Sequence, residues 1–230
     1  AITAVVPGSD TSVNDTRVSY TLSKAVASGT ITWTQTSGTA DPASPHIQPL
    51  SGAELAFGPH TAITLAAAPV LLDGAVYSVA FDVTDAAGNT APTVTSTNVI
   101  YDVTVPVITA TAPVTGAMVN NTRVSYTLSE TVGSGSITWA WAGGSADPAS
   151  PHTMALSGLE LAAGAHNNIT LGNNPVLVDG AIYSIGFNAM DVAGNIAATV
   201  LNTNITYDIT LPVVSATAPI PGAHVLVVLE

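Results

Sequence analysis

The chain has 230 residues, of which only 8% are charged, and its three basic residues stand against fifteen acidic ones, for a formal net charge of −12. Nucleic acid and anionic membrane surfaces are excluded as partners, because three cations cannot make the several phosphate contacts that such binding requires. The sequence has no cysteine and no apolar stretch near the about 18 residues of a membrane-spanning helix, so it predicts neither a disulfide nor membrane insertion.

Apolar and polar residues alternate along the chain, which is the pattern of half-buried β-strands. In Arg17–Ser23, for example, Val18, Tyr20 and Leu22 share one face. About seven short strands separated by turns predict an all-β fold, an immunoglobulin-like sandwich of antiparallel sheets. In chain order, the clearest expected elements are strands at Ile2–Val6, Arg17–Ser23 and Thr30–Gln35, a short helical turn at Ser51–Ala56, and strands at Ala75–Thr84 and Thr93–Tyr101.

Most of this pattern then occurs a second time. Asn14–Ser23 (NDTRVSYTLS) returns as Asn120–Ser129 (NNTRVSYTLS), and Leu71–Asn89 returns as Leu177–Asn195. The offset is about 106 residues, which is the size of a complete domain and too long for a solenoid unit of about 20–50 residues. We therefore predict two tandem immunoglobulin-like repeats, at residues 1–104 and 105–210.

Residues 211–230 are expected to begin a third copy. Ala216–Val225 matches Ala110–Val119, which predicts the first strand of a truncated third repeat, and the final Leu229-Glu230 resembles an expression-vector scar. The apolar segment Val225–Leu229 would lack a sheet of its own. Because an unpaired strand edge seeks a partner, we expect self-association through this segment, besides contacts between neighbouring repeats of the chain.

Two further segments carry a family resemblance. The run Tyr77–Asn89 (YSVAFDVTDAAGN) and the Pro-ended connectors Tyr101–Pro106 and Tyr207–Pro212 resemble bacterial immunoglobulin-like repeats of large surface adhesins. The resemblance implies an extracellular array of sandwiches, often stiffened by calcium and built as a stalk. The absence of cysteine favours the same bacterial origin, because secreted sandwiches of this size from disulfide-forming pathways often carry a bridge.

The aromatic residues are predicted to be structural. Trp33 and Trp139 lie in mid-strand, where immunoglobulin-like sandwiches bury a tryptophan, and Tyr77 and Tyr183 occupy the position of a tyrosine corner. Trp141 has no aromatic counterpart in the first repeat, and it shares the face of Trp139.

The histidines offer a metal-binding alternative. His46 and His60 with Glu54, or His152 and His166 with Glu160, could form a zinc site of two histidines and one carboxylate. Their position in Pro-rich loops favours ordinary turn residues instead, and His224 stands alone near the C-terminus. The sequence holds no nucleophile elbow, phosphate-binding loop or zinc-protease helix, so we predict no catalytic residues and no enzyme activity.

Calcium is the strongest chemical hypothesis. Calcium takes six to eight oxygen ligands, and this acidic chain has few cations to neutralise its carboxylates. The sandwich topology would bring Asp73 and Asp102, at the far end of the first repeat, close to Glu130 and the loop Asp191–Asn195 of the second. We therefore expect Asp73, Asp102, Glu130, Asp191 and Asn195 to be ligands of a calcium ion at the junction, although aspartate also caps turns by bonding its own backbone.

One exchange between the repeats bears on this hypothesis. Lys24 in the first repeat corresponds to Glu130 in the second, whereas most acidic positions are acidic in both. A lysine would oppose a metal ion at its end of the domain. Either the junctions differ from one another, or position 130 is not a ligand.

These observations predict a non-catalytic extracellular spacer, cut from the stalk of a large bacterial surface or secreted adhesin-like protein. The alternative is an accessory module that binds a carbohydrate or another ligand directly. Such a module needs exposed aromatic side chains, and Trp141 is the candidate.

Overall fold

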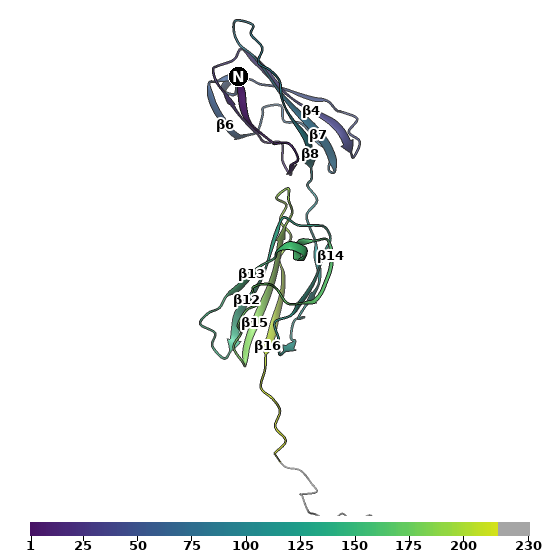
Figure 1. The fold of residues 1–230 in the computed structure, drawn as a ribbon, viewed down its shortest axis with the longest axis vertical. Coiled ribbons are helices and arrows are strands. Elements are labelled where there is room, and N and C mark those ends of the chain that lie inside the picture. Colours follow the sequence, from purple (N-terminus) through teal and green to yellow (C-terminus); the bar gives the residue numbers. More distant parts are fainter. Residues whose placement is uncertain (216–230) are drawn as a thin grey trace, which may run out of the picture.

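The computed structural model describes residues 1–215 of the chain. It contains two β-sandwiches that follow one another along the long axis of the molecule (Figure 1). The expected third-repeat strand at Ala216–Val225, the apolar segment Val225–Leu229, the predicted scar Leu229-Glu230 and His224 lie outside the described residues.

The first repeat is built from two sheets, and both contain strands of this repeat alone. A small sheet has the order β1-β3-β6 and a larger one the order β2-β8-β7-β4-β5. Its elements are β1 (Ile2–Val6), β2 (Ser12–Val13), β3 (Val18–Leu22), β4 (Ser28–Gly38), β5 (His46–Pro49), the 3-10 helix η1 (Gly52–Leu55), β6 (Gly58–Ile63), β7 (Ala75–Thr84) and β8 (Val94–Tyr101).

The second repeat has the same order of elements and the same sheets. The small sheet is β9-β11-β14 and the larger one is β10-β16-β15-β12-β13. Its elements are β9 (Ile108–Ala112), β10 (Met118–Val119), β11 (Val124–Leu128), β12 (Ser134–Gly144), β13 (His152–Ala155), η2 (Gly158–Leu161), β14 (Gly164–Ile169), β15 (Ala181–Met190) and β16 (Val200–Tyr207).

The all-β, immunoglobulin-like fold predicted from the sequence is confirmed, with one difference in the strand count. Each repeat has eight strand segments because its opening strand is divided between the sheets. β1 pairs antiparallel with β3, whereas β2 pairs parallel with β8. Pro7 lies between β1 and β2, and a proline has no N–H with which to continue the ladder, so the chain crosses to the other sheet there.

The cores follow the alternation seen in the sequence. Along β7, Tyr77, Val79, Phe81 and Val83 are buried between the sheets, and Trp33 of β4 packs edge-on against Tyr77 with ring centroids 6.0 Å apart. Trp139 makes the same contact with its own repeat's tyrosine, so the predicted burial of both tryptophans is confirmed.

The short helical turn predicted at Ser51–Ala56 is present as η1, and the corresponding segment of the second repeat, Ser157–Ala162, forms η2. Each begins with a capping box, in which a glutamate accepts a hydrogen bond from the backbone N–H of the serine three residues before it. None of the helices in residues 1–215 is long and apolar enough to cross a membrane.

Candidate metal centre

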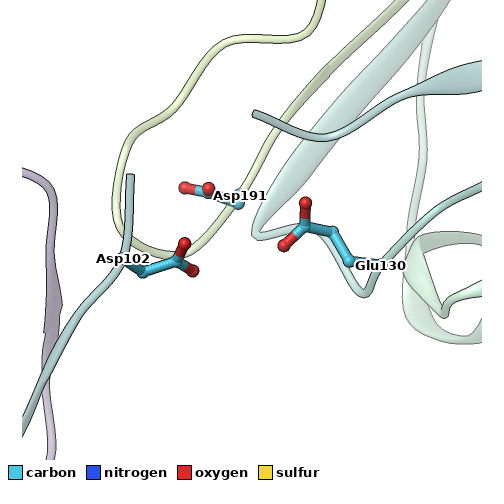
Figure 2. Close-up of side chains that lie close together, drawn as sticks. All are labelled: Asp102, Glu130 and Asp191. Atoms are coloured by element: carbon cyan, nitrogen blue, oxygen red, sulfur yellow. The ribbon is translucent and has the colours of Figure 1, made fainter. Parts of the chain in front are cut away.

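Three carboxylates from separate segments meet where the two repeats join. Asp102 directly follows β8 of the first repeat, whereas Glu130 follows β11 and Asp191 follows β15 of the second. One oxygen from each of the three carboxylates lies within 4.8 Å of the other two, and Figure 2 shows the three groups turned toward one another. The cluster is therefore assembled by the packing of two domains, not by either domain alone.

The loop between β15 and β16 holds Asp191 in place. Its Oδ1 accepts hydrogen bonds from the backbone N–H groups of Gly194 (2.7 Å) and Asn195 (2.8 Å), and its Oδ2 accepts one from the Asn195 side chain (2.7 Å). Gly194 has a φ of +98°, which only glycine adopts readily. The Asp191 side chain is thus fixed by its own loop before any partner approaches it.

Asn195 ties this loop to the first repeat. Its amide nitrogen donates to the backbone carbonyl of Asp102 (2.9 Å), and its amide oxygen accepts from the side chain of Asn14 (3.2 Å). The loop containing Asn195 extends from the second sandwich toward the first (Figure 1). Asn195, predicted as a metal ligand, therefore lies beside the cluster as a bridge between the domains.

Asp73 also lies at the junction, but its carboxylate has other partners. One oxygen accepts from the backbone N–H of Val103 and the other from the hydroxyl of Thr104, both at 2.8 Å. These two bonds hold the pKa of Asp73 below its usual range. The same arrangement links Asp179 to Ile209 and Thr210 at the end of the second repeat.

Asp73 lines a cleft of about 330 Å³ with Asp102 and Glu130. Its two hydrogen bonds hold the start of the connector against the first repeat.

Negative charges are crowded together in the cluster, and they affect the ionisation of Glu130 and Asp102. Burial raises the pKa of Glu130, and the charges of Asp102, Asp191 and Asp73 raise it further. Burial and the charges of Asp191 and Asp73 likewise raise the pKa of Asp102. Oε1 of Glu130 is buried with no hydrogen-bond partner among the described residues. Such crowding favours whatever neutralises the carboxylates, either protons or a metal ion.

The spacing of the cluster suits a large, hard cation. Two oxygens bound to one calcium ion at about 2.4 Å can lie no more than about 4.8 Å apart, so three carboxylates at the observed spacing could share one ion. The Asp102, Glu130 and Asp191 side chains offer only oxygen, which is the donor type that calcium prefers. Backbone carbonyls and water would have to complete the six to eight ligands.

The histidines are not brought together, so the zinc alternative has no geometric basis in residues 1–215. His46 bonds Asp41 at 2.6 Å, while His60 stacks on Tyr20 and bonds the carbonyl of Ala56 at 3.0 Å. The glutamates of the predicted sites are used in the capping boxes of η1 and η2. His152 and His166 repeat these separate arrangements in the second repeat.

A buried polar network in each repeat was not anticipated from the sequence. The Tyr77 hydroxyl, which forms the predicted tyrosine corner, accepts from the N–H of Leu72 (3.1 Å) and donates to Asp41 (2.7 Å), which also bonds His46. The sequence contains a sign of this network, the motif DPASPH, which occurs at Asp41–His46 and again at Asp147–His152. Its aspartate and its histidine recur together with the tyrosine. The network fixes the loop after β4 to the core.

Trp141 is partly exposed, as a ligand-contacting aromatic residue would be. The side chain is 45% exposed, and its ring N–H donates to the carbonyl of Ser145 at 2.9 Å. Trp141 lies beyond the buried Trp139 in β12, where the sandwich ends, so it lies at the edge of the core and not within it.

No protein-family model matches the chain, and no curated protein matches it. Among solved structures, the chain is similar to the FN1–FN3 domains of chicken CNTN1, with 11% sequence identity and a TM-score of 0.41 over 86% of this chain and 67% of that one. The likeness is one of fold alone. The chain itself is a tandem pair of immunoglobulin-like sandwiches with three carboxylates gathered where they join.

Proposed function

We propose that this chain is a non-catalytic spacer from the stalk of a large, extracellular bacterial adhesin-like protein, and that calcium bound between consecutive repeats fixes their relative orientation. The observation that supports the proposal is the origin of the three carboxylates. Asp102 leaves the first repeat, whereas Glu130 and Asp191 belong to the second. An ion held by all three would be a bond between domains.

The donor set favours calcium over other divalent ions. Zinc prefers histidine and cysteine, neither of which lies in the cluster. Magnesium demands a near-octahedral shell at about 2.0–2.1 Å and keeps much of its water, whereas calcium accepts irregular sites of several carboxylates. A site of three carboxylates that is open to a cleft would bind calcium weakly, in the range of about 0.1–1 mM typical of extracellular modules, which supports a location outside the cell.

The connector supports a mechanical role. Only a few residues separate the end of β8 at Tyr101 from the start of β9 at Ile108, and Pro106 lies among them. Such a connector is stiffer than a Gly/Ser linker of equal length. The hydrogen bonds from Val103 and Thr104 to Asp73 hold the start of the connector, so fewer of its residues are free to move. Domains joined in this way can keep a distal binding region away from a surface.

Scattering and thermal unfolding in EDTA and in millimolar calcium would test this function. We expect calcium to lengthen and narrow the distribution of particle dimensions and to raise the unfolding temperature, because a ligand that binds only the folded state stabilises it. Asp102→Asn should weaken both effects. The matched control is Asp208→Asn, because Asp208 makes the same turn bond to the second residue after it but follows the second repeat.

Two results would count against the proposal. If the chain has the same dimensions and thermal stability in EDTA as in calcium, no junction calcium is bound. If the two repeats tumble independently in both conditions, the chain is a flexible tether and not a stiff spacer.

A further inference from the structure

The first repeat has a lysine where the second has Glu130, and the structure shows what the lysine does. The Lys24 ammonium donates to Oδ2 of Asp85, whose side chain is buried, and forms an ion pair with it. Asp85 is the counterpart of Asp191 in the sequence repeat. The acidic cluster lies at the end of the second repeat that faces the first. At the corresponding end of the first repeat, the positive charge of Lys24 lies against Asp85.

The two domain ends are otherwise built alike. In both, the aspartate closes its loop through its own N–H, which donates to the carbonyl of the asparagine four residues later, at 3.0 Å for Asp85 and 3.1 Å for Asp191. In both, the aspartate Oδ1 accepts from that asparagine's N–H, at 2.9 Å and 2.8 Å. The main chemical difference at these two loops is therefore the charge of residue 24 or 130.

We propose that this one position selects the cation that holds a junction: a divalent ion where the residue is Glu130, and the ammonium of the side chain where it is Lys24. The inference rests on the proposed function, because it takes the cluster at Glu130 to be a metal site. It adds that the corresponding end of the first repeat receives its neighbour without metal.

The charges at the two ends support this division. At the junction seen in the structure, Asp102, Glu130 and Asp191 bring three negative charges together. If the connector of another copy of this repeat docked on the first repeat in the same way, its aspartate would meet Lys24 and Asp85, with a net charge of only −1. An ammonium has three N–H donors and can bond two carboxylates at once, whereas a divalent ion would be repelled by it.

The ionisation of the aspartate agrees with the same reasoning. The Lys24 hydrogen bond, followed by that from Asn89, holds the pKa of Asp85 well below its usual range. At the other end, Oε1 of Glu130 is buried and has no hydrogen-bond partner among residues 1–215. At the end of the first repeat, Lys24 balances the charge of Asp85. At the end of the second repeat, the cluster consists of carboxylates alone. The occupant that fits the end of the first repeat is the connector of another copy of the repeat, which carries an aspartate directly after its last strand, as Asp102 and Asp208 do.

Two substitutions in the intact chain test the inference, Glu130→Lys and Glu130→Gln. The glutamine variant removes the negative charge and adds none, so it serves as the matched control. The docked fraction of the two repeats is measured by paramagnetic relaxation between a spin label on one repeat and amides of the other. Measurements are made in EDTA at a temperature where Glu130→Gln is about half undocked, and circular dichroism verifies that both variants fold.

We expect Glu130→Lys to be mostly docked in EDTA under these conditions, and calcium to leave its docked fraction unchanged. A docked fraction in EDTA no greater than that of Glu130→Gln would overturn the inference, as would calcium binding by Glu130→Lys with the wild-type affinity. Failure of the proposed function looks different, because then the wild-type chain itself would not respond to calcium, whatever the order of the two variants in EDTA.

Discussion

The side-chain amide of Asn14 donates a 3.2 Å hydrogen bond to the amide oxygen of Asn195, and so links the first repeat to the second. Asn195 also bonds the carbonyl of Asp102 and the carboxylate of Asp191. A single amide thus joins the first repeat, the connector and the acidic loop. Part of the junction is therefore independent of any metal.

Replacing Asn14 should loosen the junction without affecting either core. Asn14→Ala removes one partly exposed hydrogen bond, worth about 0.5–1.5 kcal/mol, and should lower the ratio of docked to undocked molecules by up to about tenfold in EDTA. Backbone ¹⁵N relaxation, which reports whether the repeats tumble together, measures the change. Asn120→Ala alters the equivalent position of the second repeat and should leave the tumbling unchanged.

Removing the hydroxyl of Tyr183 should destabilise the second repeat. This hydroxyl accepts from the N–H of Val178 at 3.0 Å and donates to Asp147 at 2.7 Å, and both partners would lose a bond in a buried site. Tyr183→Phe should cost about 1–3 kcal/mol, measured by urea unfolding. Tyr207→Phe is the control, since its hydroxyl makes no hydrogen bond within residues 1–215, and its effect should stay below about 0.5 kcal/mol.

The buried tyrosines predict a limit to stability in alkali. Burial, together with the charge of Asp41 or Asp147, raises the pKa of Tyr77 and of Tyr183 to about 12. A pKa raised on folding means that the stabilisation is complete below the unfolded value of about 10 and is lost as the pH rises through the folded value. Unfolding should therefore begin between these values and coincide with the rise of tyrosinate absorbance. Tyrosines that titrate near their unfolded value while the fold persists would contradict this.

The aspartates of the same networks predict the acid limit. The hydrogen bonds from His152 and then from Tyr183 hold the pKa of Asp147 below its usual range. A lowered pKa gives stability that is present above the unfolded value of about 3.9 and is lost as the pH falls through the folded one. Asp147→Asn should have a lower free energy of unfolding than the wild type at neutral pH. This difference between the two proteins should disappear in acid. Urea unfolding at several pH values measures it, and a constant gap would refute the explanation.

The sequence was informative wherever the repeat exposed a periodic pattern. The burial of Trp33 and of its counterpart Trp139 followed from their mid-strand positions, because alternation fixes which face of a strand points inward. The meeting of Asp102 with Asp191 followed from topology, because both residues end strands that run to the junction. That these groups bind calcium stays a prediction.

Side-chain partners were harder to predict, since they depend on loop conformations that alternation does not fix. Asp73 was expected as a ligand because it is acidic and at the correct end of the domain, but its carboxylate reaches the connector backbone. Lys24 was recognised as an exchange, yet its pairing with Asp85 needed the folded loop. The role of the Asp41 loop residues was missed for the same reason, because they meet Tyr77 only across the sandwich edge.

The parallel pairing of β2 with β8 has a mechanical consequence. These segments are joined by hydrogen bonds of 2.9 Å from Ile100 to Thr11 and from Asp102 to Val13, close to where the chain leaves the repeat. Tension applied to the two ends of a repeat would slide the strands past each other lengthwise. Bonds loaded in shear must break together, whereas those of a hairpin pulled from one end break in turn. The hydrogen bonds between β2 and β8 should therefore resist the unfolding of a repeat that is pulled at its two ends.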